Sequence, residues 1–278
     1  MNGVPESVTQ QRPKIADLLS HAFLRVQERY QLLLLLAALA GLVSSLLFAP
    51  AYNVMTDFAK VLQEGSQDAS ATKAIELLSD RWPALIWGQL MVTALNAILL
   101  IPWARAVLGN GLAPYDEDFN RMVRRSFRAF WHMTLANILL ISAVLTGASV
   151  LNALLSAVGF LALVLVFAGI FILVWFAIFI NAVANYAVVC EASDQPTTLA
   201  LSWRALKPNA RPAAASLAIF FLMYFFLSSL LSSGLNGLGL GYDRVWLIIS
   251  GTLSFLLSAL HVAALTVFFR PTRVDEVV

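Results

Sequence analysis

Six long apolar runs without a single Asp, Glu, Lys or Arg residue constrain this chain more than any other feature. They cover 31–49, 84–104, 132–154, 160–189, 213–232 and 245–269. A helix needs about 20 predominantly apolar residues to cross the hydrocarbon core of a bilayer. Charged residues make up only 12% of the chain, whereas soluble domains carry about a quarter. The sequence therefore predicts an all-α polytopic membrane protein with six transmembrane helices in one membrane domain, 1–278.

Three of these runs follow segments in which apolar and basic residues recur with helical periodicity. The segments are 14–30, 116–131 and 194–211. Phe119, Phe127 and Trp131 share one helix face, and the nearby arginines share another. Helices with an apolar aromatic face and a basic face lie in the headgroup layer of a membrane. We expect three amphipathic interfacial helices, and the candidate contacts to lipid headgroups or a partner are Arg121, Arg124, Arg125, Arg128, Arg204 and Lys207.

The arginine cluster also has a plainer interpretation. Segments on the cytoplasmic side of a membrane carry an excess of Lys and Arg whatever the protein does. The functional alternatives are recognition of anionic phospholipid and docking of an acidic cytoplasmic partner. Composition alone does not separate these three interpretations.

The distribution of basic residues predicts the orientation. Six crossings place the N-terminal segment, the 2–3 link, the 4–5 link and the C-terminal tail on the same side. All but four of the 18 lysines and arginines lie there, and the four exceptions are Lys60, Lys73, Arg81 and Arg244. The positive-inside rule then makes both termini cytoplasmic. We expect a multi-pass protein of the bacterial inner (cytoplasmic) membrane.

The order of segments suggests three units, each an interfacial helix followed by a helical hairpin. They cover 14–105, 116–190 and 194–270, between a disordered tail, 1–13, and a short tail, 271–278. A possible threefold repeat is one interpretation. The other is that all helices entering a cytoplasmic leaflet share this residue pattern, whether or not they are repeats.

The connections also carry signals. The longest, 50–83, contains two short helical patterns at 53–64 and 71–80. Ser156 to Gly159 forms a tight uncharged hairpin between the third and fourth spans. In the first span, Ala37, Gly41 and Ser45 are four apart, and such small-residue faces let another helix approach closely.

Polar side chains form stripes on three spans. The stripes consist of Gln89, Thr93 and Asn96; of Asn181 and Asn185; and of Ser254, Ser258 and His261. Amides in hydrocarbon need partners, so we expect these faces to point into the bundle. They form either interhelical hydrogen bonds or the wall of a polar cavity. No pair of histidines has metal-ligand spacing, and we expect no metal, no cofactor and no catalytic residue.

The segment from Leu201 to Lys207, LSWRALK, resembles a motif of the YciC-like proteins. The DUF975-type proteins and the membrane domain of glycerophosphoryl diester phosphodiesterases share that motif. The opening segment, IADLLSHAFLRVQERYQLLLLL, is similar to their first amphipathic helix. Pro208 and Asn209 replace the glycine that usually follows the lysine. The resemblance implies an integral membrane protein associated with envelope upkeep, without the soluble phosphodiesterase activity.

Three functions follow from these patterns. The first is a non-catalytic protein of envelope or lipid homeostasis, or a subunit of a larger assembly, with phospholipid and a protein partner or second copy as partners and no nucleic acid. The second is a membrane subunit of an ATP-driven permease, because Glu191-Ala192-Ser193 faintly resembles its coupling loop, with Thr197 in place of the usual glycine. The third is an intramembrane lipid-modifying enzyme that uses His132 or His261.

Overall fold

The computed structural model describes residues 13–64, 67–109, 119–158, 160–195, 197–237 and 244–269, and these ranges contain helices and no strand. The helices are α1 (Ile15–Leu47), α2 (Ala49–Glu64), α3 (Gln67–Leu108), α4 (Phe119–Val158), α5 (Phe160–Ala192), α6 (Leu199–Leu206), α7 (Ala210–Gly237) and α8 (Arg244–Leu265), with short 3₁₀ turns η1 (Lys207–Asn209) and η2 (Thr266–Phe268). Six helical segments are long and apolar enough to cross a membrane. The prediction of an all-α polytopic membrane protein with six spans is confirmed.

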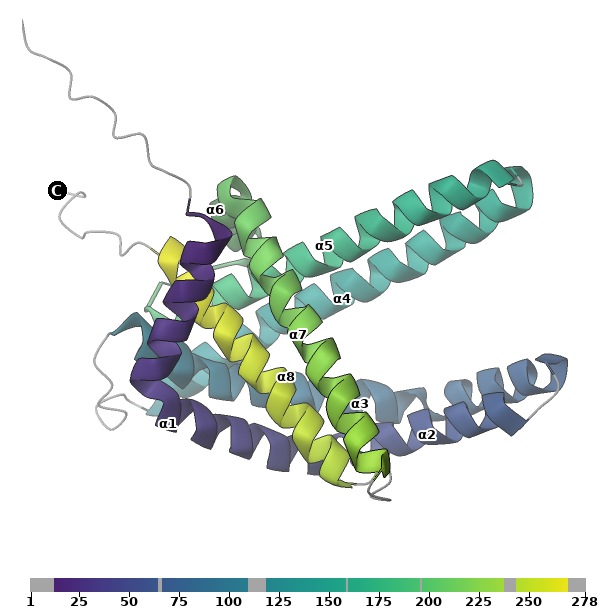
Figure 1. Cartoon of the computed structure of the whole chain (residues 1–278), viewed down its shortest axis with the longest axis horizontal. Helices are drawn as coiled ribbons and strands as arrows, with labels where there is room; N and C mark the ends of the chain where they lie inside the picture. Colours follow the sequence, from purple (N-terminus) through teal and green to yellow (C-terminus); the bar gives the residue numbers. More distant parts are fainter. Residues whose placement is uncertain are drawn as a thin grey trace, which may run out of the picture.

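Two long helical hairpins extend from a bundle that contains α1, α7 and α8 (Figure 1). One hairpin joins α4 to α5, and the other joins α2 to the first part of α3 (Figure 1). With 40 residues and a rise of about 1.5 Å per residue, α4 is roughly twice as long as a 30 Å hydrocarbon core is thick. A helix of this length must tilt strongly or extend beyond the hydrocarbon.

The helices are more continuous than the sequence patterns suggest. The expected helix at 53–64 belongs to α2, but the expected helix at 71–80 is the first part of α3, which passes through both Pro83 and Pro102. The expected start of the second interfacial helix at residues 116–118 lies outside the described residues, as do residues 1–12 of the first predicted tail and all of the second. From Phe119 onward this segment is one helix with the third span.

The other two amphipathic segments are set off from their spans by local breaks. In α1, Arg29 departs from helical geometry with φ −132° and ψ 25°, at the boundary predicted between segment 14–30 and the first span. In the third segment, α6 ends at Leu206 and η1 contains Pro208, which lacks the N–H that a continuing helix would need.

The core lies where α1, α3, α5 and α8 meet. Trp103 of α3 is fully buried there, and its indole N–H donates to the carbonyl of Ala259 in α8 at 2.7 Å. A buried indole N–H needs such a partner, so this bond fixes how α3 and α8 face each other. Trp82 and Trp87, which flank Pro83 in α3, are more than half exposed.

The most extensive contact between helices that are distant in sequence joins α1 to α8. Gly41 makes this approach possible. A Cβ atom at Gly41 would lie 2.0 Å from Thr252 Oγ1 and 2.6 Å from the carbonyl oxygen of Ile248. Gly251 of α8 is matched to α1 in the same way, since a Cβ there would be 3.2 Å from the Cα of Gly41. The small-residue face predicted in the first span is thus where α8 packs.

Gly41→Ala is expected to destabilise the protein by about 1–3 kcal/mol, because a backbone oxygen cannot rotate away from the added methyl group. Thermal unfolding in detergent measures the loss. The matched control is Gly234→Ala in α7, where a Cβ meets nothing within 4 Å. Equal unfolding temperatures for the two variants would contradict the close α1–α8 contact.

Candidate functional site

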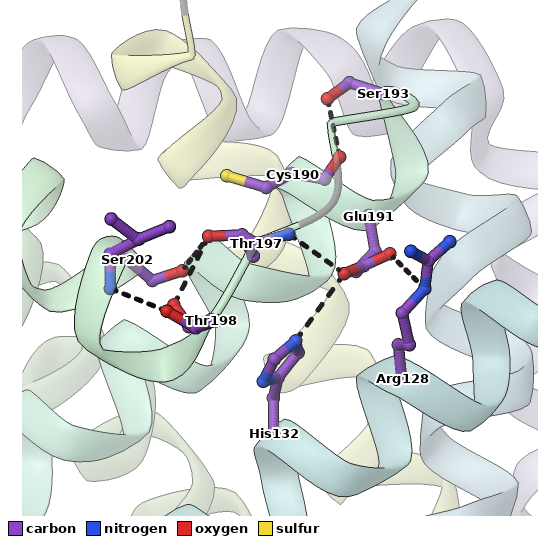
Figure 2. A network of polar contacts seen from close by, with 9 residues as sticks. Arg128, His132, Cys190, Glu191, Ser193, Thr197, Thr198 and Ser202 are labelled. Carbon is purple, nitrogen blue, oxygen red and sulfur yellow. Dashed lines mark hydrogen bonds and ion pairs between the residues drawn. The ribbon is translucent and has the colours of Figure 1, made fainter.

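A buried carboxylate organises the junction of α4, α5 and α6 (Figure 2). Glu191, in the last turn of α5, is 1% exposed. Its Oε2 lies 3.1 Å from Arg128 Nε, and its Oε1 lies 3.6 Å from His132 Nε2. Arg128 and His132 are four residues apart on α4, so they project from the same face of that helix. The buried carboxylate of Glu191 therefore joins α4 to the end of α5.

The backbone after α5 completes this cluster. The amide N–H of Thr197 donates to Glu191 Oε1 at 3.2 Å, and the Thr197 hydroxyl lies 3.2 Å from Ser202 Oγ in α6. The side chain of Thr198 caps α6 by accepting from the Leu201 N–H at 3.2 Å. Glu191 thus fixes the path of the chain from α5 into α6.

Asp194 adds a second ion pair beside the first. The N–H groups of Asp194 and Gln195 donate to the carbonyls of Glu191 and Cys190, which is the hydrogen-bond pattern of a Schellman motif. Asp194 occupies its left-handed position, with φ 65°. From there its carboxylate pairs with Arg125 of α4.

Trp203 packs α6 onto α5 next to this cluster. Its ring lies edge-to-face with Phe179, with centroids 4.6 Å apart, and it also contacts Phe176 at 6.4 Å. Aromatic pairs of this kind contribute about 0.5–1.5 kcal/mol beyond their buried area. The tryptophan of the motif LSWRALK therefore has a packing role.

The structure divides the arginine cluster instead of exposing all of it. Arg125 is 5% exposed and Arg128 is half-buried, because both pair with acidic side chains at the end of α5. Arg125 is therefore largely enclosed and Arg128 partly so, and the predicted contacts of these arginines to lipid headgroups or a partner stay a prediction. Arg121 and Arg124 are exposed, as are Arg204 and Lys207. The aromatic face of α4 is also exposed, with Phe119 at 71%, Phe127 at 58% and Trp131 at 50%.

Two of the predicted polar stripes meet inside the bundle. His261 of α8 is fully buried, and its Nδ1 lies 2.9 Å from the amide nitrogen of Asn185 in α5. Its Nε2 lies 3.3 Å from the carbonyl oxygen of Ala213 in α7. The amide can only donate and the carbonyl can only accept, so the imidazole carries its proton on Nε2. One side chain thus links three helices.

The remaining stripe residues do not join this centre. In α3, Thr93 accepts from Asn137 of α4 at 3.4 Å, while Gln89 is exposed and Asn96 is half-buried. Asn181 donates to the carbonyl of Ala177 in its own helix, α5. Ser258 donates to the carbonyl of Ser254 in α8, and the Ser254 residue is exposed. Of the two readings left open by the sequence, these contacts favour interhelical packing over a continuous polar cavity.

The cluster around Glu191 contains His132, one of the two histidines of the enzyme alternative. His132 has no acidic neighbour within a helical turn in the sequence, yet the fold brings Glu191 to it. Within the described ranges, no three His, Cys, Asp or Glu side chains are grouped to hold a metal ion. In the loop compared with a permease coupling loop, Glu191 is buried and Asp194 is exposed.

The sequence patterns single out Arg128 but not its partner Glu191, which they place only at the start of a loop. The sequence nevertheless carries a signal for this pairing. Arg128 and Glu191 are the same number of residues, or nearly so, from the link between α4 and α5, and the same holds for Arg125 and Asp194. Residues placed in this way face each other in an antiparallel hairpin.

Comparisons with protein-family models, curated proteins and solved structures found no match to this chain. The resemblance to the YciC-like proteins therefore stays a prediction.

Proposed function

We propose that this chain is a non-catalytic, multi-pass protein of the bacterial inner membrane with both termini in the cytoplasm. It binds anionic phospholipid at the cytoplasmic leaflet and acts in envelope or lipid homeostasis, or as a membrane subunit of a larger assembly. The observation that carries the proposal is the division of charge at one end of the bundle. There Glu191 and Asp194 are paired with Arg128 and Arg125, whereas four other basic side chains are exposed.

The exposed cations belong to two parts of the chain that one ion pair connects. The pair between Arg125 and Asp194 holds the start of α4 beside the turn between α5 and α6. Arg121 and Arg124 are therefore on the same end of the molecule as Arg204 and Lys207. Each cation near an anionic leaflet contributes about 1 kcal/mol, so four hold this end at the membrane surface. The exposed Phe127 and Trp131 provide apolar contact alongside.

The transporter alternative is less well supported by the same geometry. A coupling loop must offer its surface to an ATPase, but Glu191 is enclosed by Arg128, His132 and the Thr197 amide. His261 also favours the non-catalytic proposal, because both of its ring nitrogens have hydrogen-bond partners inside the bundle.

The first test concerns sidedness. In a Cys190→Ala background, Ser79→Cys and Ala205→Cys place single thiols at two exposed positions. A membrane-impermeant maleimide is expected to label position 79 in intact spheroplasts, and position 205 only after permeabilisation. The reverse pattern would refute the orientation and with it the proposed function.

The second measurement concerns lipid. Anionic lipids should be enriched relative to the membrane extract among the lipids that native mass spectrometry finds on the protein. The triple variant Arg121→Gln, Arg124→Gln and Arg204→Gln should lower this enrichment several-fold. Enrichment that is absent in the unaltered protein, or unchanged in the variant, would argue against lipid binding through these residues.

A further inference from the structure

A groove of about 1260 Å³ lies between the start of α1, the middle of α5 and the corner formed by η1 and α7. The start of α1 and that corner are near each other at the same end of the molecule (Figure 1). The groove exceeds the roughly 300–1,000 Å³ of ordinary small-molecule pockets. Its walls are of two kinds, a basic set and an aromatic set.

The basic set consists of Lys14, Lys207 and Arg211. No acidic residue lines the groove, and among the described residues no carboxylate forms an ion pair with any of these three side chains. This differs from Arg125 and Arg128, whose charges are balanced by Asp194 and Glu191. Three cations converging on one groove favour an anionic group there.

The aromatic set comes from α5. Phe171 is 72% exposed and Trp175 is 40% exposed, and both line the groove. Pro208 and Pro212 add a stiff apolar edge at the η1–α7 corner. Phe171 and Trp175 belong to Phe167–Ala192, one of the helical segments long and apolar enough to cross a membrane. The groove therefore combines basic side chains with exposed aromatic ones.

We infer that this groove binds one anionic glycerophospholipid. Its phosphate lies among Lys14, Lys207 and Arg211, and an acyl chain lies along Phe171 and Trp175. The inference rests on the proposed function in that it places the groove at the cytoplasmic leaflet. It goes further by assigning a discrete site, separate from the exposed arginines of α4 and α6. An acidic segment of a partner protein would match the cations, but it has no use for the aromatic wall.

The experiment uses the full chain in detergent micelles and brominated phosphatidylglycerol, because bromine on the acyl chains quenches nearby tryptophans. The fluorescence lost from Trp175 is the difference between the protein and its Trp175→Phe variant. We expect saturable quenching by brominated phosphatidylglycerol and much weaker quenching by brominated phosphatidylcholine. The triple variant Lys14→Gln, Lys207→Gln and Arg211→Gln should weaken the apparent affinity at least about tenfold.

The matched control removes the same charge elsewhere. Arg121→Gln, Arg124→Gln and Arg204→Gln should leave the Trp175 signal unchanged, and Lys207→Arg should retain binding. Equal quenching by the two lipids, or equal losses in both triple variants, would overturn the inference. So would unchanged quenching in the groove variant together with loss of a copurifying acidic protein. The assay does not depend on orientation, so a failed sidedness test and a failed groove test are distinguishable.

Discussion

Glu191→Ala is expected to lower the free energy of unfolding by about 3 kcal/mol. Removing one member of a buried ion pair typically costs about 3–5 kcal/mol, because the other charge is left buried without a partner. Arg128 is 38% exposed at its side chain and can recover some hydration, which places the expected loss at the lower end. His132, at 10%, has less access to water. Thermal unfolding in detergent, followed by gel filtration and near-ultraviolet circular dichroism, measures the change.

Two further variants separate charge from shape at this position. Glu191→Gln keeps an acceptor for the Thr197 amide and should lose less stability than Glu191→Ala. The double variant Glu191→Leu and Arg128→Leu should recover part of the loss, since replacing both charges removes the unpaired one. Glu76, which is exposed in α3, provides the control Glu76→Ala, with an expected change below about 0.5 kcal/mol. A Glu191→Ala variant as stable as this control would show that the ion pairs contribute nothing.

His261→Ala is expected to cost about 3 kcal/mol. The imidazole is fully buried and touches Asn185, Ala213 and the ring of Phe220. Its removal leaves a cavity among α5, α7 and α8, and it also leaves the Asn185 amide without this partner. Hydrogen bonds between membrane helices contribute about 0.6 kcal/mol on average, so most of the loss should come from the cavity.

A double-mutant cycle with Asn185→Ala tests this division. The coupling energy between the two positions should lie near 1 kcal/mol, well below the loss from His261→Ala alone. Ser258→Ala is the control, because Ser258 bonds within its own helix and is only half-buried. A His261→Ala variant no less stable than Ser258→Ala would contradict a close-packed junction at this histidine.

The number and approximate positions of the spans could be predicted, because an uncharged apolar run of sufficient length forms a helix in hydrocarbon. The ends of the helices could not be predicted. Pro83 ends the polar connection that the sequence predicts, but α3 continues through it. A proline removes only one helical hydrogen bond, and neighbouring turns can supply the rest of the helix. Local residue types therefore do not fix where such a helix begins.

The amphipathic pattern of α4 shows the limit of prediction for the site. Periodicity established two faces, one aromatic and one basic, but it could not say what each face meets. The basic side is partly buried because Glu191 and Asp194, distant in sequence, lie against it. The aromatic side is left exposed on the surface. Pairing across a long hairpin is a property of its register, which single-segment patterns do not contain.

The contact between α1 and α8 has a consequence for biogenesis. During synthesis α1 leaves the ribosome long before α8 (Arg244–Leu265) does. The face of α1 around Gly41 and Ser44 therefore lacks its packing partner for most of translation. Lipid or a chaperone must shield that face in the nascent chain. The bundle can therefore complete its packing only after α8 has been synthesised, and its helices do not all pack in the order in which they are translated. A ribosome that stalls before residue 244 would leave an unfinished intermediate for quality control to remove.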